Sequence, residues 1–181
     1  MIVKTIFSGF GGQGVLMMGF TLAQAAMNAG YQVTFLPAYG AEVRGGTANC
    51  TVAVSDDEIA SPIASEPDYV IVLNTPSLYT FQNRVAADGC LFINSSIIAV
   101  EPSRRDIRIF KIPASEIAEQ TGNLRTVNTV MMGAFLKTTA LIAPDVYLES
   151  LAEAMGSKKK SIIDVNRKAF AAGFKYLEES T

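Results

Sequence analysis

The sequence predicts an α/β fold, a three-layer α/β/α sandwich built around a mostly parallel sheet. Short apolar segments of strand length alternate with longer segments in which apolar residues recur at helical spacing. A glycine-rich turn separates the first apolar segment from the first helical one, as in a Rossmann-like βαβ unit. No internal repeat, low-complexity tract or linker divides residues 1–181, so we expect one domain.

The expected elements alternate along the first two thirds of the chain, and three helices close it. The expected strands are residues 1–8, 31–36, 49–54, 68–74, 89–94 and 108–112. The expected helices are residues 12–29, 75–87, 113–121, 127–142, 144–155 and 157–177.

Glycine and proline set most of these limits. Gly30 caps the first helix, Pro37 stops the second strand, and Pro76 starts a helix at its first turn. Residues 68–74 form the clearest buried central strand, because they are almost continuously apolar. We expect the first two strands to form a parallel pair with a right-handed crossover.

Composition excludes several classes of function. With 49% hydrophobic and 18% charged residues the chain is globular, and a net charge of −2 argues against a nucleic-acid-binding surface. The start of the chain lacks the uninterrupted apolar region of a signal peptide, because residues 8–14 break it. Lys137 and two threonines interrupt the longest apolar helix, which reads as buried, not membrane-spanning. We expect a cytoplasmic protein with no membrane contact.

The sequence offers few groups for catalysis. Histidine is absent, which removes Ser-His-Asp and Cys-His chemistry, and the two cysteines, Cys50 and Cys90, are isolated from one another. An iron–sulfur cluster or a structural zinc needs four ligands, so this chain alone is not expected to hold either. We therefore assign no catalytic and no metal-binding residue.

The glycine-rich turn is the first candidate site. Its candidate residues are Gly9, Gly11, Gly12, Gln13 and Gly14. Three of the glycines satisfy the dinucleotide fingerprint G-x-G-x-x-G, whose backbone N–H groups approach a phosphate at a helix N-terminus. The fingerprint also needs an acidic residue after the second strand, whereas the next acid here, Glu42, lies in the loop beyond. Two interpretations stay open: the turn contacts an anion or cofactor, or it only permits close packing.

A second candidate site follows the second strand. Residues 39–47 read Tyr-Gly-Ala-Glu-Val-Arg-Gly-Gly-Thr, and the candidate residues are Tyr39, Glu42, Arg44, Gly45 and Gly46. Arg44 could bind a phosphate or carboxylate bidentately, or could pair with Glu42 and only order the loop. Because ligands of α/β folds bind at the carboxyl edge of the sheet, we favour a functional role. A third candidate, Asn128, begins an apolar helix, where an asparagine is usually a structural cap.

Four motifs together resemble a known family. They are Gly9-Phe10-Gly11-Gly12-Gln13-Gly14, Tyr39-Gly40-Ala41-Glu42-Val43-Arg44-Gly45-Gly46, Asn128-Thr129-Val130-Met131-Met132-Gly133 and Asn166-Arg167-Lys168-Ala169-Phe170. In this order they resemble the gamma subunit of 2-oxoacid:ferredoxin (acceptor) oxidoreductases, and the resemblance extends from residue 2 to about residue 177. One position departs from the pattern, because Val127 stands where the family would have alanine.

The resemblance implies a subunit that is inactive alone. The complex oxidatively decarboxylates a 2-oxoacid, forms acyl-coenzyme A and passes electrons to ferredoxin. Thiamine diphosphate and iron–sulfur clusters are expected on its alpha, beta and delta subunits. The glycine turn, the Tyr39 loop and Asn128 would then face coenzyme A, substrate or a neighbouring subunit. The resemblance favours 2-oxoglutarate or a branched-chain 2-oxoacid, and an isolated chain could self-associate.

The sequence leaves two alternatives open. One is a stand-alone nucleotide-binding protein with a Rossmann-like fold, against which the missing acid after the second strand counts. The other is a purely structural assembly subunit whose glycine turn binds nothing.

Overall fold

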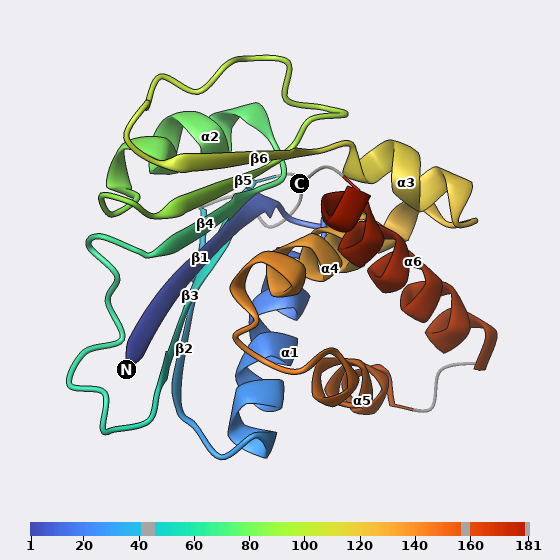
Figure 1. The fold of residues 1–181 in the computed structure, drawn as a ribbon, viewed down its shortest axis with the longest axis horizontal. Coiled ribbons are helices and arrows are strands. Elements are labelled where there is room, and N and C mark those ends of the chain that lie inside the picture. The colour runs from blue at the N-terminus through green and yellow to red at the C-terminus, as the bar shows by residue number, and fades with distance from the viewer. Residues whose placement is uncertain (41–45, 157–159, 180–181) are drawn as a thin grey trace.

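The structure, a computed structural model, describes residues 1–40, 46–156 and 160–179. Within them the strands form a mixed sheet with the order β2-β3-β1-β4-β5-β6 (Figure 1). The strands are β1 (Ile2–Phe10), β2 (Gln32–Tyr39), β3 (Thr47–Ser55), β4 (Tyr69–Val72), β5 (Cys90–Asn94) and β6 (Arg108–Ile112). The α-helices are α1 (Val15–Asn28), α2 (Thr75–Phe81), α3 (Ala114–Gln120), α4 (Val127–Thr139), α5 (Pro144–Met155) and α6 (Lys160–Glu179). Two 3₁₀ helices are η1 (Gln82–Arg84) and η2 (Leu124–Thr126).

Helices cover both faces of the sheet, which confirms the α/β sandwich, but they cover them unequally. The short α2 lies on one face, while α1 and the C-terminal helices lie on the other (Figure 1). The larger apolar core, with Phe7 and Phe135, lies between the sheet and the helices α1 and α4, and it continues between α4 and α6. The smaller core, with Val72 and Leu78, lies under α2. No helix in the described part of the chain is both long and apolar enough to cross a membrane.

The first βαβ unit differs from the expected one in its strand pairing. β1 and β2 run in the same direction, but β3 lies between them and is antiparallel to both. The parallel neighbour of β1 is β4. Residues 40–46 are too few for a helical crossover, so β2 returns directly into β3 as a hairpin. The expected parallel pairing of the first two strands is therefore wrong, although only β3 among the described strands runs against the others.

The second strand also extends further than expected. Pro37 does not stop it, because β2 continues to Tyr39 and Pro37 lies opposite Cys50 of β3. β2 is an edge strand, and an edge strand tolerates a proline because one side of it has no partner for an N–H. The strand therefore carries Tyr39 to the carboxyl edge of the sheet.

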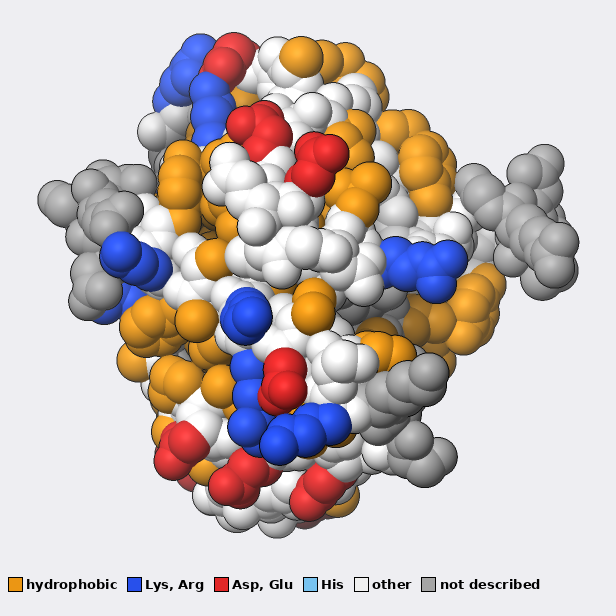
Figure 2. All heavy atoms as spheres, turned by 90° about the vertical axis from the view of Figure 1, so that its right-hand side faces the viewer, with side chains coloured by type: hydrophobic (Ala, Val, Ile, Leu, Met, Phe, Trp, Pro, Cys, Tyr) orange, Lys and Arg blue, Asp and Glu red, His pale blue; other side chains and the backbone are white. Residues whose placement is uncertain are grey.

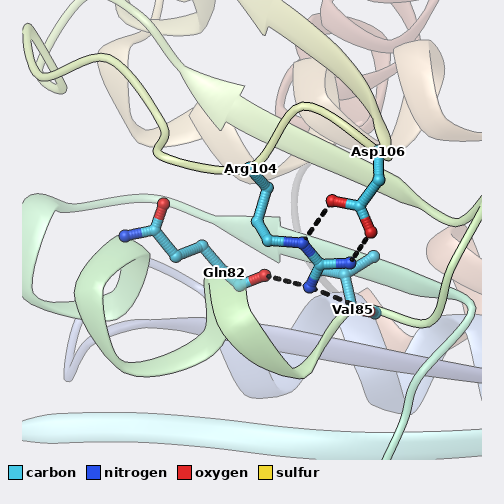
Figure 3. Close-up of polar contacts among 4 residues, drawn as sticks. All are labelled: Gln82, Val85, Arg104 and Asp106. Carbon is cyan, nitrogen blue, oxygen red and sulfur yellow. Dashed lines mark hydrogen bonds and ion pairs between the residues drawn. The ribbon is translucent and has the colours of Figure 1, made fainter.

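Arg104 fastens the long connection between β5 and β6 to the end of η1. Its Nε and Nη2 donate to the two carboxylate oxygens of Asp106, each at 2.6 Å, and Nη1 donates to the backbone oxygens of Gln82 and Val85 at 3.4 and 3.1 Å (Figure 3). The donation from Arg104 lowers the pKa of Asp106 to about 2. The arginine thus donates to backbone oxygens at the end of this short helix.

Candidate functional site

The glycine turn joins β1 to α1 and depends on two backbone conformations that favour glycine. Gly12 has φ +97° and Gly14, which caps α1, has φ +77°. A Cβ on Gly9 would lie 2.7 Å from Oε1 of Gln13 and 2.8 Å from a methyl carbon of Val15. The turn therefore needs glycine for close packing at Gly9 and for backbone geometry at Gly12 and Gly14.

Gln13 anchors this turn from the inside. Its Oε1 accepts hydrogen bonds from the backbone N–H of Phe10 at 2.7 Å and from Nδ2 of Asn74 at 3.2 Å. Its Nε2 donates to the backbone oxygen of Leu73 at 3.3 Å. Asn74 in turn caps α2 by accepting from the N–H of Ser77. The amide of Gln13 therefore ties the end of β1 to the segment that follows β4.

These bonds lie at the place where an open α/β sheet usually binds ligands. β1 leads into α1 on one face of the sheet, and its parallel neighbour β4 leads into α2 on the other face (Figure 1). The crevice between the carboxyl ends of two such strands is the usual nucleotide site. Here the side chains of Gln13 and Asn74 hydrogen-bond to each other across that crevice.

The structure brings part of the second candidate site against the glycine turn. The N–H of Gly11 donates to the backbone oxygen of Gly46 at 2.9 Å, and the N–H of Gly40 donates to that of Thr47 at 2.7 Å. Tyr39, at the end of β2, is 72% exposed. The expectation that the two glycine-rich segments meet at one edge is confirmed for these residues.

Three residues predicted for this loop, Glu42, Arg44 and Gly45, lie outside the described residues. Their proposed roles stay predictions.

Asn128 supports the turn from α4. Its Nδ2 donates to the backbone oxygen of Gly14 at 3.4 Å, and a Cβ on Gly14 would lie 2.5 Å from the same nitrogen. The next residue, Thr129, donates through Oγ1 to Oδ1 of Asn166 on α6 at 2.7 Å, in a buried contact. The asparagine predicted as a site residue is thus the first of a polar series that runs from the glycine turn to α6.

Other residues of the third and fourth motifs pack α4 against α6. A Cβ on Gly133 of α4 would lie 2.1 Å from the backbone oxygen of Phe170, and a Cβ on Gly173 of α6 would lie 2.0 Å from that of Val130. The two helices therefore cross backbone to backbone, which only glycine permits.

Two hollows open beside the turn. One, of about 490 Å³, is lined by Gly12, Gln13, Ile97, Ser115, Leu124, Arg125 and Val127. The other, of about 400 Å³, is lined by Gly14, Met17, Asn123, Arg125, Thr126, Asn128, Met155, Ile162 and Asn166.

Arg125 lines both hollows, and the sequence-based site prediction missed it. Its side chain is exposed, and a guanidinium beside a helix N-terminus suits a carboxylate or phosphate. The signal in the sequence was its position three residues before Asn128, in the segment that leads into the same helix.

The buried thiol and phenol groups with raised pKa values lie in the core. Burial raises the pKa of the Cys50 thiol to about 12, and burial also raises the pKa values of Cys90 and Tyr147. These groups are protonated near neutral pH, so they are poor nucleophiles. Among the described residues, no group of three or more Cys, Asp or Glu side chains is placed to hold a metal ion. Among the described residues that line the two hollows, Arg125 has the one ionisable side chain.

Comparison with known proteins identifies the family. A family model described as pyruvate ferredoxin/flavodoxin oxidoreductase matches residues 4–176. The ketoisovalerate oxidoreductase subunit VorA of Methanothermobacter thermautotrophicus is 40% identical over 181 residues, which are 98% of this chain and 37% of VorA. The 2-oxoglutarate synthase subunit KorC of Methanothermobacter marburgensis is 30% identical over 181 residues, which are 95% of each chain. The chain thus spans little more than a third of VorA but nearly all of KorC.

Solved structures share the fold. The gamma subunit of a keto/oxoacid ferredoxin oxidoreductase from Geobacter sulfurreducens matches with a TM-score of 0.84 and 23% identity, over 97% of this chain and 95% of that one. The 2-oxoglutarate:ferredoxin oxidoreductase of Magnetococcus marinus, solved with 2-oxoglutarate, coenzyme A and succinyl-CoA bound, matches with a TM-score of 0.90 and 22% identity, over 99% of this chain and 31% of that one. The resemblance read from the four sequence motifs is thereby confirmed, and the chain belongs to the pyruvate ferredoxin/flavodoxin oxidoreductase family.

Proposed function

We propose that the chain is the gamma-type component of a 2-oxoacid:ferredoxin oxidoreductase. In this role it would help a complex to decarboxylate a 2-oxoacid oxidatively, form an acyl-coenzyme A and reduce ferredoxin. The observation that carries the proposal is the family match over residues 4–176 together with the end-to-end similarity to KorC. The fold of the Geobacter sulfurreducens gamma subunit supports it.

A branched-chain 2-oxoacid is the proposed substrate. Identity to the ketoisovalerate subunit VorA is 40%, against 30% for the 2-oxoglutarate subunit KorC. The VorA match covers only 37% of that protein, so the residues that select the substrate would lie mainly in other parts of the complex. 2-Oxoglutarate is the second candidate.

The chain itself does not fit the redox cofactors of such a complex. An iron–sulfur cluster needs four thiolate ligands, whereas the sequence has two cysteines, and both are buried with raised pKa values on different strands. We therefore assign the clusters and thiamine diphosphate to the alpha, beta and delta subunits. This chain would contribute binding and shape.

The carboxyl edge is the proposed contribution of this chain to the active-site region. Gln13 and Asn128 hold the turn from within, so its outer surface, with Tyr39 and Arg125, is open to coenzyme A or to a neighbouring subunit. Arg44 and Glu42 remain proposed members of the same edge. A purely structural role for the turn is the competing interpretation. It predicts that Gly11→Ala impairs assembly with no separate effect on coenzyme A kinetics.

A stand-alone nucleotide-binding protein is the less favoured alternative. β2 ends at Tyr39 with no carboxylate for a ribose, and Gln13 bridges the crevice that a dinucleotide would enter. Calorimetry of the isolated chain with NAD(P) distinguishes the two, because tight binding would favour this alternative.

The test of the proposal is anaerobic affinity purification of the tagged chain from its native cells, followed by identification of its partners. We expect subunits that carry thiamine diphosphate and iron–sulfur clusters to copurify in fixed ratio. Recovery of the chain alone, or with unrelated proteins, would refute the proposal.

A further inference from the structure

The outer surface of α1 carries no charged residue. From Thr5 to Ala41 the sequence contains no Lys, Arg, Asp or Glu, and it has no histidine at all. Yet α1 is not fully buried, because Phe20 is 46% and Met27 59% exposed. A helix at the surface of a globular domain normally carries polar and charged residues along its outer stripe. The outer stripe of α1 therefore has the composition of a surface that another protein covers.

This stripe continues onto the edge strand. A shallow hollow of about 280 Å³ lies between α1 and β2 and is lined by Leu16, Met17, Phe20, Phe35, Pro37 and Tyr39. We call these residues, together with Met27, the α1–β2 surface. The rings of Phe20 and Phe35 meet edge to face, with centroids 6.2 Å apart, so the two elements form one continuous apolar face.

Another exposed face of the molecule differs from it. The face formed by the C-terminal helices, on the right of Figure 1, carries acidic and basic side chains among its hydrophobic ones (Figure 2). Exposed apolar residues scattered singly are ordinary on a soluble protein, whereas a continuous charge-free patch marks an interaction site. The α1–β2 surface is such a charge-free patch.

The relatives indicate what covers it. The same domain forms nearly the whole of KorC, but only 37% of VorA and 31% of the chain of the Magnetococcus marinus enzyme. A domain that is found both separate and joined to a larger chain needs a docking surface of its own, because in the separate case no covalent link holds it. A partner that covers a charge-free face must itself be apolar there, since a charge buried without a partner is costly.

We propose that the α1–β2 surface is the docking face for the region of the oxidoreductase that shares a chain with this domain in VorA-type proteins, and that this region meets it with an uncharged, apolar face. The inference rests on the proposed function. It adds the surface through which assembly occurs and the chemistry of the opposing surface.

The test compares charge substitutions on two exposed aromatic residues in the anaerobically purified complex. Phe20→Glu places a carboxylate in the α1–β2 surface, and Tyr79→Glu places one on α2, where Tyr79 is 58% exposed. We expect Phe20→Glu to lower recovery of the other oxidoreductase subunits per tagged chain at least about tenfold, with Tyr79→Glu unchanged. Melting curves of the isolated variants report whether each variant is folded. If Phe20→Glu is unfolded, Met27→Glu replaces it, and the same roughly tenfold loss of the other subunits is expected.

A photo-crosslinking amino acid at position 20 identifies the neighbour. We expect cross-links to another oxidoreductase subunit. Full recovery of the complex with a folded Phe20→Glu variant, or cross-links only to a second copy of this chain, would overturn the docking proposal and leave the proposed function standing. If even the unsubstituted chain brings down no oxidoreductase subunit, the proposed function fails instead, and the docking proposal fails with it.

Discussion

At the point where α4 and α6 cross through Gly133 and Gly173, we expect a glycine-to-alanine substitution to destabilise the protein, although such a substitution inside a helix usually stabilises it. Replacing a glycine inside a helix with alanine usually stabilises the helix by about 0.5–1 kcal/mol. At Gly173, however, the added Cβ would lie 2.0 Å from the backbone oxygen of Val130 and 2.8 Å from its carbonyl carbon. Ordinary van der Waals contact begins near 3.4 Å, so the helices would have to separate by more than 1 Å at this point.

The cost of that separation follows from where it occurs. The obstructing atoms are backbone atoms, which cannot rotate away as a side chain does. α4 is buried along most of its length, from Thr129 to Leu136, so moving it disturbs the larger core. Overpacking a core typically costs about 1–3 kcal/mol and occasionally more, so we expect Gly173→Ala to lower the free energy of unfolding by roughly 3 kcal/mol.

The assay is urea unfolding of the isolated chain, followed by circular dichroism. The matched control is Ala171→Ser, on an exposed position of the same helix, which should change the free energy of unfolding by less than about 0.5 kcal/mol. Gly133→Ala should behave like Gly173→Ala, because its Cβ would meet the same crossing from the other side. A Gly173→Ala protein as stable as the parent, or more stable, would refute the account of the crossing.

Three further predictions concern single side chains. Thr129→Val should lower the free energy of unfolding by about 1–3 kcal/mol in the same urea assay, because the buried amide oxygen of Asn166 loses its 2.7 Å donor. Thr129→Ser keeps a hydroxyl donor and should recover the lost stability. Equal stability of the parent and the two variants would contradict this prediction. Arg104 lowers the pKa of Asp106 to about 2, so the contribution of Asp106 to stability is present above about pH 4 and is lost as the pH falls through 2. Over this range the melting temperature of the parent should therefore fall more than that of Asp106→Asn. Equal falls in the two proteins would count against the interaction. Cys50, with a pKa of about 12, should react with a thiol reagent at about pH 8 only after unfolding by denaturant, and fast labelling of the native chain would disprove its burial.

Local signals in the sequence predicted the order of the elements well. Val127 as a helix start and Pro144 at the first turn of α5 are features that a short window contains, and the structure begins helices at both. The strand pairing was not predictable in the same way. Whether β3 lies beside β1 depends on contacts between distant residues such as Phe7 and Cys50. The short connection after Tyr39 was the available signal for a hairpin.

The site shows the same division. Both glycine-rich segments were expected at one sheet edge, and the bond from Gly11 to Gly46 places them there. The sequence did not predict that the Gln13 amide hydrogen-bonds to Asn74, because Asn74 is distant in sequence and follows a different strand. Arg125 was missed for a related reason, since the hollows that it lines form only when α4 packs against the turn.

The most direct test of the assignment is a substrate panel on the complex that the tagged chain brings down under anaerobic conditions. The measurement is coenzyme A-dependent reduction of ferredoxin with 2-oxoisovalerate, 2-oxoglutarate, pyruvate and indolepyruvate in parallel. We expect reduction that requires both the 2-oxoacid and coenzyme A and that is fastest with 2-oxoisovalerate. Reduction with none of the four would contradict the proposed function, whereas a preference for 2-oxoglutarate would contradict only the proposed substrate.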